Sequence, residues 1–107
     1  MQDNKKIFIS LIVPCYNEAR VIDSTLACIV SYLEKSGYEW ELIVVDDGSR
    51  DSTVDIAKGW ADRFPRIRVL ENIMNRGKGY SVRRGYLSAS GEYIIFTDAD
   101  LSTPVEE

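Results

Sequence analysis

The chain has 107 residues, of which 45% are hydrophobic, and these values predict one small globular domain with a modest core. Its net charge of −4 argues against a nucleic-acid-binding protein, which would present a basic face. The absence of histidine excludes Ser-His-Asp catalysis, Cys-His catalysis and histidine metal ligands within these residues.

The cysteines and the apolar runs indicate a location. Cys15 and Cys28 lie far apart and form no Cys-x-x-Cys motif, which is typical of reduced thiols in a cytoplasmic protein. The longest apolar run, Ile7–Val13, is interrupted by Ser10. We therefore expect no secretory signal and no transmembrane segment in this span. The expected location is cytoplasmic, which for a full-length protein could be the cytoplasmic face of a membrane.

The first expected element is a strand at Ile7–Val13, where β-branched and apolar residues follow one another almost without interruption. Pro14 should end this strand because proline cannot donate a hydrogen bond to the ladder. Asn17 is predicted to cap a helix that runs to about Lys35, with apolar residues at helical spacing, and Gly37 should stop it.

A second apolar strand is expected at Trp40–Val45. The next helix should begin at Asp51 or Ser52 and end before Pro65. The strand expected after it, Ile67–Leu70, is short, which is typical of a position near the edge of a sheet.

The last part of the chain begins with a flexible basic loop at Asn75–Gly79. A helix of roughly Tyr80–Ala89 should follow and end at Gly91, and the fourth strand is expected at Tyr93–Thr97. Strands that alternate with helices predict an α/β fold, with a doubly wound, mostly parallel sheet and helices on both faces. A strand order of 3-2-1-4 would place the carboxyl ends of the first and fourth strands around one crevice.

Acidic residues follow the predicted strands at this edge of the sheet. They are Glu18, Asp46, Asp47, Asp98 and Asp100. Like charges this close raise one another's pKa unless a cation or a hydrogen-bond donor compensates them. Asp98 and Asp100 could hold Mg²⁺ or Mn²⁺, which prefer oxygen ligands. The alternative for Asp46 and Asp47 is a turn with an Asx-type helix start, but two acidic pairs in one crevice favour ligand binding.

The basic loop supplies the opposite charge. Arg76 and Lys78, beside two glycines, can meet phosphate oxygens at the start of a helix. Val82 stands where a dinucleotide fingerprint needs its third glycine, and no GxxxxGK[ST] motif occurs, so a Rossmann dehydrogenase and a P-loop NTPase are disfavoured. With Tyr16 able to border a base, the residues suggest group transfer from an activated nucleotide, with departure of its diphosphate.

Four short motifs lie at the strand ends and in the basic loop: Val13–Glu18, Val44–Asp51, Asn75–Gly79 and Phe96–Asp100. Together, and in this order, they resemble the family 2 glycosyltransferases of the GT-A fold. The segment Asp98–Glu107, together with Arg76–Gly79 and Val82–Gly85, looks most like the branch that makes dolichyl-phosphate glucose. The enzymes that make polyprenyl-phosphate mannose are close behind.

The resemblance implies a nucleotide-sugar site. The positions that it implies are Pro14, Tyr16, Asn17, Glu18, Val44, Asp46, Asp47, Lys78, Asp98, Ala99 and Asp100. Pro14, Tyr16 and Glu18 would line the pocket for base and ribose, and Asp46, with Val44 before it, would contact the base. Asp98 and Ala99 would touch the ribose and diphosphate, and Lys78 would approach the nucleotide. Asp98 and Asp100 would also bind Mg²⁺ or Mn²⁺. Ser102 stands where mannosyl relatives often have a glutamine near the ion, which favours the glucosyl branch.

The resemblance further implies an inverting, single-displacement transfer of a hexose. UDP-glucose is the favoured donor and GDP-mannose the second choice. The implied acceptor is a polyprenyl phosphate such as dolichyl phosphate, which is already an anion and needs no strong general base. No catalytic residue is identified within this span.

By the same resemblance, residues 1–107 look like the donor-binding amino-terminal part of a GT-A domain, truncated after the fourth strand and inactive alone. The exposed sheet edge would then invite pairing with a second copy. The alternatives are a family 2 enzyme with a saccharide acceptor and a noncatalytic nucleotide-binding or assembly module. A phosphorylated receiver domain is disfavoured because it needs its acidic pair after the first strand.

Overall fold

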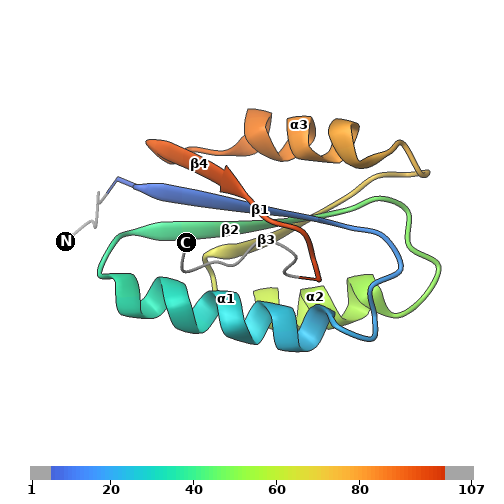
Figure 1. Cartoon of the computed structure of the whole chain (residues 1–107), viewed down its shortest axis with the longest axis horizontal. Helices are drawn as coiled ribbons and strands as arrows, with labels where there is room; N and C mark the ends of the chain where they lie inside the picture. Colours follow the sequence, from blue (N-terminus) through green and yellow to red (C-terminus); the bar gives the residue numbers. More distant parts are fainter. Residues whose placement is uncertain (1–5, 101–107) are drawn as a thin grey trace.

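The computed structural model describes residues 6–100, which form a parallel sheet with helices on both faces (Figure 1). In chain order the elements are β1 (Ile9–Cys15), α1 (Ile22–Ser36), β2 (Trp40–Asp46), α2 (Thr53–Arg63), β3 (Ile67–Glu71), α3 (Lys78–Ser88) and β4 (Tyr93–Phe96). The sheet order is β3-β2-β1-β4, and all three neighbouring pairs are parallel. The doubly wound α/β fold and the strand order predicted from the sequence are both confirmed.

The core has two layers because the central strands are apolar on both faces. Figure 1 shows α1 and α2 on one face of the sheet and α3 on the other. The larger cluster joins β1 and β2 to α1 and α2, and β2 is buried along its whole length. A smaller cluster of Ile12, Ile43 and Val45 lies on the other face, where Gly85 of α3 comes close to Ile12. None of the helices within residues 6–100 is long and apolar enough to cross a bilayer.

β1 continues further than the sequence predicts. It includes Pro14 and Cys15, which pair with Val45 and Asp46 of β2. On the other side, the carbonyl of Ile12 accepts the last ladder bond from β4, from the N–H of Thr97. Because alternate residues face the same neighbour, the nitrogen of Pro14 points beyond the end of β4, where no donor is needed. β1 can therefore include a proline near its carboxyl end without losing a hydrogen bond of the sheet.

The prediction that Asn17 caps the first helix is wrong. α1 begins at Ile22, its N-cap residue is Val21, and no side chain caps it. Asn17 instead has a left-handed backbone with φ of 54°, and its Oδ1 accepts a hydrogen bond from the N–H of Arg50. The Asn17 side chain is thus used to join the β1–α1 loop to the β2–α2 loop.

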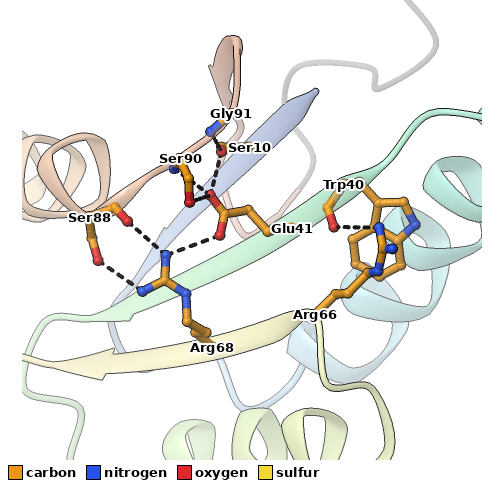
Figure 2. Close-up of polar contacts among 8 residues, drawn as sticks. All are labelled: Ser10, Trp40, Glu41, Arg66, Arg68, Ser88, Ser90 and Gly91. Atoms are coloured by element: carbon orange, nitrogen blue, oxygen red, sulfur yellow. Dashed lines mark hydrogen bonds and ion pairs between the residues drawn. The ribbon is translucent and has the colours of Figure 1, made fainter. Parts of the chain in front are cut away.

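A buried polar network lies under the connection from α3 to β4, and Figure 2 shows its contacts. Glu41 of β2 is 7% exposed, and its Oε2 accepts hydrogen bonds from Ser10 Oγ at 2.6 Å and from the N–H of Ser90 at 2.7 Å. Its Oε1 lies 3.1 Å from Arg68 Nη2, which also donates to the Ser88 carbonyl at 2.8 Å. The network ties three strands to the segment that leads into β4.

Gly91 is the point of closest approach in this network. Its N–H donates to Ser10 Oγ at 2.7 Å. A Cβ at this position would lie 2.5 Å from the same Oγ and 2.7 Å from the Ser10 nitrogen. Only glycine allows this approach, which sets the start of β4 against β1 and so determines where the acidic end of β4 lies.

Candidate functional site

A cleft of about 230 Å³ opens at the carboxyl ends of the strands. It is lined by Pro14, Cys15, Tyr16, Glu18, Asp47, Lys78, Ser81, Asp98, Ala99 and Asp100. The lining comes from the ends of β1, β2 and β4 and from the start of α3. This is the place where open α/β sheets bind ligands. The structure therefore brings together the predicted ligand positions, except Asn17, Val44 and Asp46.

Val44 and Asp46 are set back from the cleft. Val44 is fully buried in the core, and Asp46 is 2% exposed. The Asp46 carboxylate accepts hydrogen bonds from the N–H groups of Gly48 and Ser49, at 3.1 and 2.8 Å, and from Ser49 Oγ at 2.5 Å. This is the Asx-type turn that the sequence offered as the alternative. The Asp46 side chain holds the turn after β2.

Asp47 reaches the cleft and also holds the basic loop. Its Oδ1 accepts hydrogen bonds from Asn72 Nδ2 at 2.8 Å and from the N–H of Arg76 at 2.7 Å. Its Oδ2 accepts from Asn75 Nδ2 at 2.9 Å and from the N–H of Gly77 at 2.8 Å. Burial alone would raise the pKa of Asp47, but these donors outweigh burial and lower it. The Asp47 carboxylate therefore stays charged. By holding the N–H of Gly77, it sets the position of Lys78, the next residue in the chain.

The turn after β2 and the basic loop also touch through their backbones. Gly48 has φ of 82°, and a Cβ there would lie 2.9 Å from the backbone nitrogen of Asn75. α3 starts at Lys78, two residues earlier than predicted, because Asp47 fixes the preceding turn. The ammonium of Lys78 forms an ion pair with Asp98 across the cleft. The amino end of α3 therefore faces the acidic end of β4.

The Asp98-Ala99-Asp100 turn is anchored by its middle residue. Ala99 is 3% exposed and packs in the main core, and its carbonyl accepts a hydrogen bond from Thr25 Oγ1 of α1 at 2.5 Å. With Ala99 held inward, the residues on both sides line the cleft. Burial raises the pKa of Glu18, and the charges of Asp100, Asp51 and Asp98 raise it further. This corner of the cleft thus concentrates negative charge that a cation would compensate.

The donor set suits a hard divalent ion that shares its ligands with a substrate. Asp98 and Asp100 offer carboxylate oxygens from one short turn. Among residues 6–100, no three acidic or cysteine side chains come together as a complete metal site. Mg²⁺ and Mn²⁺ are often bound by one or two carboxylates, with phosphates and waters as the other ligands. The residues present fit that second arrangement.

The sequence did not point to two of the lining residues, Cys15 and Ser81. Burial and the neighbouring Asp46 carboxylate raise the pKa of the Cys15 thiol, which disfavours a nucleophilic thiolate. Ser81 Oγ accepts a hydrogen bond from Asn72 Nδ2 at 2.9 Å, so it belongs to the group of side chains around Asp47. Its place three residues after Lys78, on the same helix face, was the available signal.

Comparison with known proteins identifies a family and several related sequences. Residues 10–106 match the family described as glycosyl transferase family 2. A dolichyl-phosphate beta-glucosyltransferase of Drosophila melanogaster is 42% identical over 110 residues, which cover 96% of this chain and 34% of that protein. A dolichyl-phosphate beta-glucosyltransferase of Trichomonas vaginalis is 40% identical, over 95% of this chain and 32% of that protein. The chain thus spans about a third of the length of these curated relatives.

Solved structures share the fold at similar coverage. The mannosyltransferase PcManGT of Pyrobaculum calidifontis, in complex with GDP-Man and Mn²⁺, superposes with a TM-score of 0.75 at 27% identity. The alignment covers 94% of this chain and 34% of that one. TarS 1-349 of S. aureus, in complex with UDP-GlcNAc, has a TM-score of 0.75 at 31% identity, over 88% of this chain and 27% of that one. With a sequence match that extends over residues 10–106 and this shared GT-A architecture, the chain belongs to glycosyl transferase family 2.

Proposed function

We propose that residues 1–107 form the donor-binding part of an inverting glycosyltransferase that moves glucose from UDP-glucose to a polyprenyl phosphate such as dolichyl phosphate. The observation that carries this proposal is the cleft, where Asp98 and Asp100 lie opposite Lys78 and the amino end of α3. The names of the curated relatives support the sugar and the acceptor. The remaining length of those relatives leaves room for an acceptor site outside this span.

The geometry of the cleft supports a role for each of its charged residues. Asp98 and Asp100 would hold Mg²⁺ or Mn²⁺, and the ion would supply charge neutralisation for the departing diphosphate. Lys78 and the N–H groups at the start of α3 would bind phosphate oxygens, because a helix amino terminus favours anions. Tyr16, which is 44% exposed and lines the cleft beside Pro14, would border the base. Bound diphosphate would compete with Asp98 for the Lys78 ammonium.

A second donor, GDP-mannose, is favoured by one observation. The PcManGT structure, which holds GDP-Man and Mn²⁺, covers 94% of this chain at a TM-score of 0.75. Both donors carry a diphosphate that could share a metal ion with Asp98 and Asp100, so this corner of the cleft would not discriminate between them. The acceptor phosphate is an anion at neutral pH and needs no deprotonation, which agrees with the lack of histidine in the chain.

Replacing Asp100 with alanine tests the donor site directly. In calorimetric titration with UDP-glucose or GDP-mannose in Mn²⁺, we expect Asp100→Ala to bind at least about tenfold more weakly, since it loses a charged ligand. Chelation of the metal should weaken the wild type to a similar degree. Asp62→Ala, an exposed aspartate on α2, is the matched control and should bind as the wild type does. Donor binding that is unchanged in both Asp100→Ala and chelator would contradict the proposed site.

We further propose that the free edge of β4 pairs with a second copy of the chain. Within residues 6–100 β4 pairs only with β1, and Tyr93, Ile95 and Phe96 of β4 are 58%, 49% and 51% exposed. An exposed apolar edge strand offers unpaired backbone groups to a partner strand.

Light scattering after size exclusion tests this pairing over a range of concentrations. Wild type should shift toward a dimer as concentration rises, and Ile95→Lys should remain a monomer because a charged edge resists pairing. Leu87→Lys on α3, where the side chain is 68% exposed, is the control. A wild type that stays monomeric throughout would rule the pairing out.

A further inference from the structure

We propose that the connection between β3 and α3 docks onto an anionic lipid bilayer. The surface concerned, called the β3–α3 tip below, consists of the side chains of Ile73, Met74, Arg76, Tyr80 and Arg83. It adjoins the cleft through Gly77 and Lys78 but contributes none of the cleft lining. The proposal goes beyond donor binding and does not depend on which sugar nucleotide the cleft takes.

The tip exposes apolar side chains to an unusual degree. Ile73 is 98% exposed, Met74 57% and Tyr80 48%. Full exposure of a large aliphatic side chain forgoes the free energy that burial would release. Figure 1 shows the connection projecting past the amino end of α3, at the end of the molecule where the carboxyl ends of the strands lie. The apolar residues are therefore presented outward and not toward the sheet.

The tip is held in place from both sides. Before it, the N–H of Asn72 donates to the Asp46 carbonyl at 2.8 Å. After it, the N–H of Arg76 donates to Asp47 Oδ1 at 2.7 Å. Ile73 and Met74 lie between these anchors, and the close approach of Gly48 to the Met74 backbone restrains them further. Because the loop is already ordered, little conformational entropy is lost when its apolar residues leave water and insert into an apolar environment.

The charged residues of the tip indicate that this environment is a lipid bilayer. Arg76 and Arg83 are exposed, and the Arg76 guanidinium lies 5.5 Å from the centre of the Tyr80 ring. Arginine and tyrosine around protruding aliphatic residues are typical of the interface between water and a bilayer. Anionic lipids attract such basic residues, although the chain as a whole carries a net charge of −4. The attraction must therefore be local, and it orients the molecule with the tip toward the membrane.

The size of the tip favours a bilayer over a protein partner. Stable protein interfaces bury about 1,200 Å² or more in total, which the protruding side chains of Ile73 and Met74 do not provide. A bilayer needs only a few inserted side chains and nearby positive charge. Docking in this orientation would hold the mouth of the cleft near the lipid headgroups. If the proposed acceptor is right, its phosphate lies at the same level.

The test is co-sedimentation of the chain with vesicles of phosphatidylcholine, with and without phosphatidylserine. The wild type should bind the anionic vesicles and bind phosphatidylcholine alone only weakly. Ile73→Ser combined with Met74→Ser should weaken binding roughly tenfold or more. Arg76→Gln combined with Arg83→Gln should weaken it by at least about fivefold and reduce its dependence on salt. Tyr32→Ser and Lys35→Gln, at exposed positions of α1 on the other face of the sheet, are the controls and should bind as the wild type does.

Fluorescence supplies a second readout. Trp40 and Trp60 are 3% and 8% exposed and give a constant background. The emission of an Ile73→Trp variant should shift to the blue on anionic vesicles and be quenched by lipids brominated on their acyl chains.

The proposal would be overturned if the wild type did not bind anionic vesicles. It would equally be overturned if the variant with both Ile73→Ser and Met74→Ser bound them as well as the wild type does. It would also be overturned if the tip substitutions abolished self-association and left vesicle binding unchanged. Donor titration separates these outcomes from failure of the cleft, since no tip side chain lines it.

Discussion

Asp47→Asn is expected to lower the free energy of unfolding by about 2–4 kcal/mol and to weaken donor binding at least about tenfold. The Asp47 carboxylate is 4% exposed and accepts hydrogen bonds from four donors of the segment Asn72–Gly77. An amide in its place turns an NH₂ group toward two of those donors, and buried donors without a partner are costly. Urea unfolding and calorimetric titration measure the two effects.

Asn75→Ala is the matched control for this change. It removes one donor to Asp47 but no residue of the cleft lining. It should therefore cost about 1 kcal/mol of stability and leave donor binding within a few fold of the wild type. If Asp47→Asn proved as stable as Asn75→Ala and bound the donor equally well, the basic loop would not depend on Asp47. In that case Lys78 and the start of α3 would be positioned by other contacts.

Glu41→Ala is expected to lower the free energy of unfolding by about 3–5 kcal/mol, which is more than the loss expected for Asp47→Asn. It leaves the Arg68 guanidinium without its buried carboxylate and removes the acceptor of Ser10 Oγ and the Ser90 N–H. A typical domain is stable by only about 5–15 kcal/mol, so much of the chain population could unfold. Chemical denaturation with circular dichroism measures the loss. Glu92→Ala, an exposed glutamate next to β4, is the control and should change little.

The same residue predicts how stability depends on pH. Burial alone would raise the pKa of Glu41, but hydrogen bonds from Ser10 and Ser90 and the charge of Arg68 outweigh it and lower the pKa. A carboxyl whose pKa is lower in the folded state stabilises the protein above its unfolded pKa. That stability is lost as the pH falls through the folded pKa. Glu41→Gln keeps the shape without the charge and should flatten the acid limb of the stability curve. An acid limb that is identical in Glu41→Gln and wild type would contradict this assignment.

Several site residues could be predicted because their roles follow from local position. Asp98 and Asp100 stand directly after an apolar strand, and Lys78 follows a glycine at the start of a helix, so all three lie at the carboxyl ends of the strands in a doubly wound sheet. Asp46 and Asp47 could not be told apart in the same way. They are neighbours in sequence and face opposite sides of the strand end, so one enters the turn and the other reaches the cleft.

The apolar runs and the helical spacing of the sequence by themselves determined the order of elements and the parallel sheet. Both features depend on local burial patterns and on the handedness of crossovers, which a single chain displays in order. The resemblance to the family came separately, from the four short motifs at the strand ends and in the basic loop. Only the tertiary structure decided the start of α1, the partners of Asp47 and the outward position of Ile73. Each of these depends on contacts between residues distant in sequence, such as Asn17 with Arg50 and Asp47 with Gly77. Periodicity carries no information on such pairs, because they form only when the strand ends are brought together.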